Sequence, residues 1–204
     1  MEIIDISRRF FSCEVYPGDP KPEAEQIAEI GKDSECNLTA VHACVHTGTH
    51  ADAPLHFIPD GMPIDEMALE PYIGPCTVIE VPGGVITGEY VDEHFPKECR
   101  RLLVKGGGTA YFMDSSAQEL TERGLWLIGT DSLSVGCKGN QTGPHRAFLS
   151  EGVAILEGLD LTRVAPGEYF LFAPPVLYDG LDGAPVRAVL IKDYIFWSKP
   201  SAHK

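Results

Sequence analysis

Short apolar runs separated by turn residues recur along the whole chain. Val, Ile, Leu and aromatic side chains cluster over a few positions, and Gly, Pro, Asp or Ser follows most clusters. The pattern predicts β-strands over residues 3–6, 38–45, 76–81, 101–104, 125–128, 153–156, 169–172 and 186–191. Residues 23–30 fit either a helix or one arm of a hairpin, and periodicity alone does not decide between them.

Three further segments have the pattern of short helices, namely residues 87–95, 115–124 and 144–150. The second has a Ser cap, a Glu in its first turn and Gly124 at its end. The third begins with Pro144 and is followed by Gly152. Because strands outnumber helices, we expect an α/β or α+β protein with a mixed sheet rather than a helical bundle.

Length and composition indicate one ordinary globular domain. The 204 residues suffice for a substantial core, and no linker or internal repeat divides the chain, so we expect residues 1–204 to form a single domain. The apolar share of 44% and the charged share of 23% are typical of such domains. No apolar run is long enough for a membrane-spanning helix.

The chain is strongly acidic, with a formal net charge of -14. Like charge repels nucleic acids and anionic membranes, so neither is expected as a partner, whereas small-molecule substrates remain compatible. The first residues carry no basic leader, and the six cysteines are scattered without CxxC pairs. We therefore expect reduced thiols and a cytoplasmic location.

Four metal-donor side chains lie close together between residues 46 and 56. A Gly and a Pro in this segment disfavour a long helix. Imidazole and carboxylate donors suit Zn, Mn or Fe, and no Cys lies in the segment to favour a structural zinc site. All four positions have the same parity, so an extended chain would project them from one side. The sequence therefore predicts a catalytic metal site built from His46, His50, Asp52 and His56.

A hydrolytic metal site needs open positions for water, which His46, His50 and Asp52 would leave around one metal. Further donors are expected from His145, in the third predicted helix, and from Glu157, directly after an apolar run. A carboxylate is costly to bury there unless it is paired or metal-bound, and a solvated strand end is the alternative.

Some neighbouring side chains have two interpretations. Asp131 either supports a ligand His or caps a turn, and Thr49 and Ser134 are either turn hydroxyls or site groups. Cys44 has the parity of the cluster, and we interpret it as a packing residue rather than a nucleophile.

The segment His46-x-Gly48-Thr49-His50-x-Asp52-Ala53-Pro54-x-His56 resembles the signature of the cyclase-like metal-dependent hydrolases, a family that includes bacterial kynurenine formamidases and isatin hydrolases. The similarity continues in the same order through residues 5–7, 16–19, 129–134, 145–146, 152–157 and 181–188. The resemblance implies a swivelling β/β/α domain with a mixed central sheet, which assembles as a homodimer or larger homo-oligomer.

The resemblance also implies a role for each matching residue. His46, His50 and Asp52 would bind one metal, and Asp52 would also reach a second. His145 would bind the second metal, and Glu157 would bridge both. Zn²⁺ is the expected ion, with two per chain possible and Mn²⁺ as the alternative.

Two more residues are assigned by the same resemblance. His56 matches the proton donor and acceptor of the bacterial formamidases. Tyr16 stands before Pro-Gly-Asp, where those enzymes carry a Trp that contacts an aromatic substrate. Tyr keeps a stacking face and adds a hydroxyl, so an aromatic substrate is compatible with this difference.

The expected activity is metal-dependent hydrolysis of an amide carbon–nitrogen bond in a small molecule. An aryl formamide of the N-formylkynurenine type is the expected substrate, and an isatin-like lactam or another cyclic amide is the alternative. Two hypotheses come from other classes: a non-haem metal oxidoreductase, since two His and a carboxylate also form its iron site, and a non-catalytic metal-binding protein. The additional donors His56, His145 and Glu157 disfavour the oxidoreductase.

Overall fold

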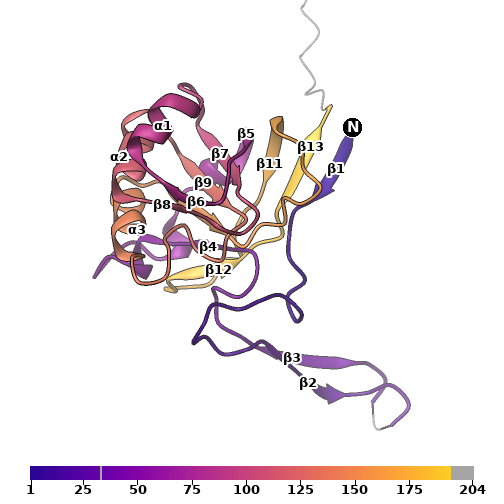
Figure 1. The fold of residues 1–204 in the computed structure, drawn as a ribbon. Coiled ribbons are helices and arrows are strands. Elements are labelled where there is room, and N and C mark those ends of the chain that lie inside the picture. The colour runs from indigo at the N-terminus through magenta and orange to yellow at the C-terminus, as the bar shows by residue number, and fades with distance from the viewer. Residues whose placement is uncertain (33, 194–204) are drawn as a thin grey trace, which may run out of the picture.

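The computed structural model describes residues 1–32 and 34–193, and its centre is a mixed sheet of nine strands (Figure 1). The strand order across the sheet is β1-β13-β11-β5-β7-β9-β10-β4-β12. The strands are β1 (Glu2–Asp5), β13 (Val189–Lys192), β11 (Gly167–Phe172), β5 (Ile73–Glu80), β7 (Arg101–Lys105), β9 (Leu127–Thr130), β10 (Ala154–Glu157), β4 (His50–Asp52) and β12 (Gly183–Pro185). Strands β5, β7, β9 and β10 run parallel, and the remaining pairings in this sheet are antiparallel.

Three helices stack along one side of the sheet (Figure 1). They are α1 (Gly88–His94), α2 (Asp114–Glu122) and α3 (Thr142–Leu149). Leu102 of β7 packs with these helices, whereas the next residue, Leu103, packs in a second cluster of buried residues. The central parallel strands are therefore apolar on both faces, which explains their continuous apolar runs in the sequence.

Smaller elements complete the fold. A parallel pair, β6 (Gly84–Ile86) and β8 (Ala110–Phe112), lies beside the main sheet, and short 3-10 helices cover Pro54–His56, Ile64–Glu66 and Glu70–Tyr72. Among the described residues, no helix has both the length and the apolar character needed to cross a membrane.

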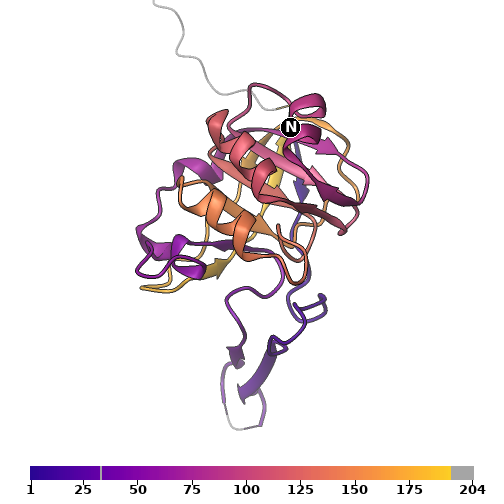
Figure 2. The same ribbon diagram turned by 60° about the vertical axis from the view of Figure 1, so that its left-hand side comes forward.

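A hairpin projects away from the rest of the chain in both views (Figures 1 and 2). It consists of β2 (Glu23–Ala28) and β3 (Leu38–His42), paired antiparallel. The ambiguous segment 23–30 is thus mainly a strand and not a helix. Its apolar side chains Ile27, Leu38 and Val41 are each more than half exposed, at 52%, 53% and 55%.

The predicted elements are all present, and the errors lie at their ends and in the shortest strands. The strand predicted over residues 38–45 ends at His42, and that over 186–191 begins at Val189. The predicted Ser cap of α2 is wrong, because Met113 is the capping residue and the Ser116 hydroxyl bonds back to its backbone. Strands β4, β6, β8 and β12, of three residues each, were too short to show a pattern. The polar tail 196–204, including His203, lies outside the described residues.

Strand β4 carries two of the predicted metal donors into the sheet. It pairs with β10 so that His50 lies opposite Glu157, and with β12 so that Asp52 lies opposite Gly183. Directly after β10, Gly158 has a φ of +65°, and a Cβ atom there would lie 2.1 Å from the carbonyl oxygen of Gly48. This close approach fixes the turn before β4 against the end of β10.

The substitution Gly158→Ala is expected to lower the free energy of unfolding by about 2–5 kcal/mol. About 1–2 kcal/mol comes from the left-handed backbone, and about 1–3 kcal/mol from the contact with Gly48. Gly180→Ala is the matched control, since its φ is +71° and no atom lies within 4 Å of the added carbon. Denaturant unfolding of both variants measures the difference, and equal losses would show that the Gly48 contact contributes nothing.

Candidate metal centre

The five predicted metal ligands converge from separate parts of the fold. His50 and Asp52 lie on β4, and His46 lies in the turn before it. His145 comes from α3, and Glu157 ends β10. The pairing of β4 with β10 explains why residues so far apart in the chain meet here.

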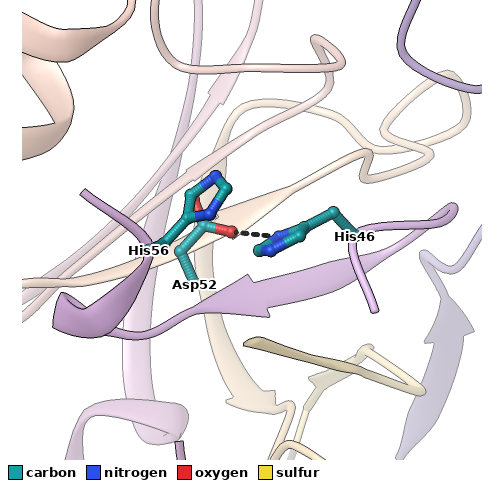
Figure 3. A group of neighbouring side chains, drawn as sticks. All are labelled: His46, Asp52 and His56. Atoms are coloured by element: carbon teal, nitrogen blue, oxygen red, sulfur yellow. Dashed lines mark hydrogen bonds and ion pairs between the residues drawn. The ribbon is translucent and has the colours of Figure 1, made fainter. Parts of the chain in front are cut away.

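The parity argument from the sequence holds for only two of the four clustered donors. His50 and Asp52 share one side of β4, while Ala51 between them is fully buried on the other. His46 approaches through a turn in which Gly48 has a φ of +70°, and His56 ends the 3-10 helix Pro54–His56. The predicted extended segment is therefore wrong, but the side chains of His46, Asp52 and His56 still lie close together (Figure 3), and His50 lies 3.3 Å from Asp52.

Two buried carboxylates face the imidazole rings at short distances. Oδ1 of Asp52 lies 3.0 Å from Nδ1 of His46 and 3.3 Å from Nε2 of His50. Oε1 of Glu157 lies 3.1 Å from Nε2 of His145, and Oε2 lies 3.5 Å from Nε2 of His50. The second oxygen of Asp52 is buried, makes no hydrogen bond among the described residues, and lies 3.5 Å from Nε2 of His145.

The opposite nitrogens of these rings are already engaged with acceptors. Nδ1 of His50 donates to the Gly48 carbonyl at 3.0 Å, and Nδ1 of His145 donates to the Gln141 carbonyl at 2.7 Å. Nε2 of His46 faces an Asp182 oxygen at 2.9 Å. Because carbonyls and carboxylates only accept, a neutral ring in each place turns an unprotonated nitrogen toward Asp52 or Glu157. An unprotonated ring nitrogen and a carboxylate oxygen are both acceptors, so a proton or a metal ion is required between them.

Protons are one source of that positive charge. Burial alone would lower the pKa of His50 and His145, but hydrogen bonds to Asp52 and Glu157 and the charges of these carboxylates raise both values to about 10. For the two carboxylates, burial favours a higher pKa, and the histidines hold it below the ordinary value. Without a metal, the site is a network of imidazolium–carboxylate pairs.

A divalent metal ion is the other source, and the donor set fits it. Two sets of three donor residues have ligand atoms within 4.8 Å of one another among the described residues: His46 with Asp52 and His56, and His50 with Asp52 and Glu157. Asp52 belongs to both, so a carboxylate shared by two cations is compatible with the geometry. The buried Asp52 oxygen that makes no hydrogen bond is also suited to bind a cation.

His56 has a different environment from the other rings. Its Nδ1 lies 3.2 Å from Asp182 Oδ2, and its ring stacks on His46 with centroids 3.9 Å apart. Burial lowers its pKa below the ordinary histidine value. The sequence analysis assigned no role to Asp182, although this residue lies in the segment 181–188 that resembles the family.

A cavity of about 350 Å³ adjoins these side chains. Besides four of the histidines and Glu157, it is lined by Tyr16, Asp19, Cys44, Phe57, Leu133, Ser134 and Gln141. Tyr16 therefore lines the cavity beside the predicted site, and Cys44 lines it rather than packing in the core.

The remaining ambiguous residues have defined contacts. The Asp131 carboxylate accepts backbone N–H groups from Gly106, Gly107 and Gly108 at 3.0–3.1 Å, so it caps a turn and supports no histidine. The Thr49 hydroxyl donates to the Gly158 carbonyl at 2.6 Å, which ties the turn before β4 to β10.

Comparison with known proteins places this arrangement in a family. A model of the putative cyclase family matches residues 4–136. A kynurenine formamidase from Salinibacter ruber is 34% identical over 206 residues, which cover 93% of this chain and 97% of that protein. A solved structure of a potential metal-dependent hydrolase with cyclase activity has a TM-score of 0.78 at 26% identity, covering 93% of this chain and 96% of the other.

The isatin hydrolases share the fold at lower identity. Isatin hydrolase A from Labrenzia aggregata has a TM-score of 0.79 at 19% identity, over 93% of each chain. These structures confirm the mixed α/β architecture expected from the sequence. The similar proteins cover 93% of the chain, and the residues matched by the family model include the segment that holds His46, His50 and Asp52. The chain belongs to the cyclase family.

Proposed function

We propose that this protein is a divalent-metal-dependent amidohydrolase that cleaves an aryl formamide of the N-formylkynurenine type. The observation that carries the proposal is the meeting of three imidazoles with two buried carboxylates beside a cavity. The similarity to a kynurenine formamidase along almost the whole chain supports the choice of reaction. Residues 1–204 would form one such domain.

The proposed ligands divide between two metal positions. His46, His50 and Asp52 would hold one ion, and His145 and Glu157 would hold a second together with Asp52. Zn²⁺ is the proposed ion and Mn²⁺ the alternative, because imidazole and carboxylate donors suit both. When bound, such an ion lowers the pKa of a coordinated water toward about 7 and polarises the substrate carbonyl.

His56 is the proposed proton carrier. Because its Nδ1 faces a carboxylate, that nitrogen bears the ring proton and Nε2 is free to accept another. The lowered pKa keeps the ring neutral at pH 7, as a general base requires. His56 would take a proton from the attacking water and return it to the departing nitrogen.

A second cavity supports a substrate with a charged tail. It measures about 710 Å³ and shares Tyr16, Leu133 and Ser134 with the cavity at the metal ligands. Side chains of both signs line it, among them Arg8, Lys138, Glu14 and Asp160. An amino-acid zwitterion can use both signs, whereas a neutral bicyclic lactam such as isatin offers no matching charge. The cavity thus favours N-formylkynurenine over isatin.

The protein is also proposed to assemble as a homodimer or larger homo-oligomer in the cytoplasm. The exposed apolar side chains Ile27, Leu38 and Val41 on the projecting β2–β3 hairpin support self-association, since a lone hairpin gains little stability from its own contacts.

Metal content and its dependence on pH give the first test of this function. We expect at least one divalent ion per chain by elemental analysis after gentle purification. In the metal-free protein, the pKa of His50 and of His145 is raised to about 10. The stability that this shift contributes is fully present below the ordinary pKa of 6.5 and is lost as pH rises toward 10. The Tm of metal-free protein should therefore fall from about pH 7 to about pH 9.

Added Zn²⁺ or Mn²⁺ should remove most of that fall, because a metal replaces the protons between the carboxylates and the rings. Metal content well below one ion per chain that neither Zn²⁺ nor Mn²⁺ restores, with a Tm independent of pH, would contradict the metal site.

The substitution His56→Ala should lower kcat by about 10²- to 10⁴-fold, the usual contribution of a positioned acid or base, with metal content almost unchanged. His46→Ala and Asp52→Ala should lose metal. His94→Ala, on the exposed part of α1, is the control and should have the kcat and the metal content of the unmodified enzyme. Loss of metal from His56→Ala would instead make His56 a ligand, since it lies within reach of His46 and Asp52.

The substrate is tested by steady-state rates on N-formylkynurenine and isatin side by side. Tyr16→Ala should raise KM for N-formylkynurenine several-fold, because a ring contact contributes about 0.5–1.5 kcal/mol beyond its buried area. Tyr16→Phe keeps the ring and should change KM little. A much larger kcat/KM for isatin would move the protein to the lactam hydrolases, and turnover of neither by metal-loaded enzyme would reject the proposed substrate.

A further inference from the structure

One carboxylate outside the predicted set contacts two of the predicted rings. Oδ2 of Asp182 lies 2.9 Å from Nε2 of His46 and 3.2 Å from Nδ1 of His56. The two rings stack on each other, with planes 29° apart. A single oxygen therefore accepts from both the proposed metal ligand and the proposed proton carrier.

The backbone around Asp182 holds this carboxylate in place. The Asp182 carbonyl accepts the N–H of Ala53 at 3.0 Å, and the carbonyl before it, from Leu181, accepts the N–H of Ile64 at 2.9 Å. The next residue, Gly183, pairs with Asp52 across β12 and β4. These bonds anchor Asp182 to the segment that carries the proposed ligands.

The glycine after Asp182 allows the close approach. A Cβ atom at Gly183 would lie 2.7 Å from Cε1 of His46 and 2.8 Å from the carbonyl oxygen of Ala51. Without a side chain at this position, β12 reaches the edge of the His46 ring. The Asp182 side chain is then within hydrogen-bond distance of both rings.

We propose that Asp182 is a positioning residue that fixes the tautomer and orientation of His56 and, through the same oxygen, those of His46. The proposal rests on the amide-hydrolase function proposed above and extends it to a residue outside the metal ligands. Asp182 touches no reacting atom and acts through the two rings.

The geometry distinguishes this role from simple support of a metal ligand. Among the described residues, Asp182 is the only hydrogen-bond partner of the His56 ring, whose side chain is 28% exposed. A neutral imidazole without an acceptor at Nδ1 populates both tautomers, and one of them has no base at Nε2. With the carboxylate present, the ring keeps its proton at Nδ1 and its lone pair at Nε2.

The first experiment is a double-mutant cycle at saturating metal. Asp182→Ala should lower kcat about 10- to 100-fold with little change in KM, the usual cost of removing a carboxylate that orients a site histidine. The double variant Asp182→Ala/His56→Ala should be no slower than His56→Ala alone, because both changes remove one function. Asp182→Asn, which keeps the side-chain size, should also lower kcat and guards against misfolding of the Ala variant.

The matched control is Asp179→Ala. Asp179 is an exposed carboxylate in the same loop, and its substitution should leave kcat unchanged. An unchanged kcat of Asp182→Ala at saturating metal would show that Asp182 supports only the proposed metal ligand His46. Multiplicative losses in the double variant would likewise overturn the proposal.

A second measurement does not depend on activity. Nitrogen NMR of the imidazole rings in metal-loaded protein should show His56 protonated at Nδ1, and Asp182→Ala should shift it toward a mixture of tautomers. An Nε2-protonated His56, or a tautomer unchanged by Asp182→Ala, would reject the positioning role. If the enzyme hydrolyses no formamide but the tautomer responds as expected, the proposed function fails while this inference stands.

Discussion

The arrangement of the site depends on two buried carboxylates that face the ring nitrogens of histidines. Asp52 and Glu157 are almost fully buried, and isolated negative charges at such depth are very costly. Each imidazole that faces them is held at its other nitrogen by an acceptor, so neutral rings cannot supply the missing protons. The local fold is therefore compatible only with added positive charge, either as protons on the rings or as metal ions.

The sheet topology brings those charges together. Strand β4 has only three residues, yet it lies between β10 and β12 and pairs with both. One face of β4 carries His50 and Asp52 toward Glu157, while Ala51 is fully buried on the opposite face. The close contact of Gly158 with Gly48 fixes the turn that presents His46. Burial of Ala51 offsets part of the free-energy cost of burying the charged groups on the other face of β4.

The sequence predicted the donors better than the way in which they meet. Residue type and clustering were enough to select His46, His50 and Asp52, and the apolar run before Glu157 indicated a strand end, with a solvated end left as the alternative. The regular strands of the central sheet were visible because their apolar runs are long. The turn at Gly48 was not, since parity assumes an extended chain and a positive φ depends on the tertiary contact with β10.

The rings of the site also differ in how their orientation is set. His50 and His145 donate to carbonyls two and four residues away in the chain, so local folding of β4 and α3 is sufficient to orient them. His46 and His56 depend on Asp182, which lies 136 and 126 residues away. The resemblance of residues 181–188 to the family marked the segment of Asp182, but only the pairing of β12 with β4 shows which rings it contacts. The orientation of His50 and His145 therefore depends on contacts close in the chain, whereas that of His56, the proposed proton carrier, depends on the pairing of β12 with β4.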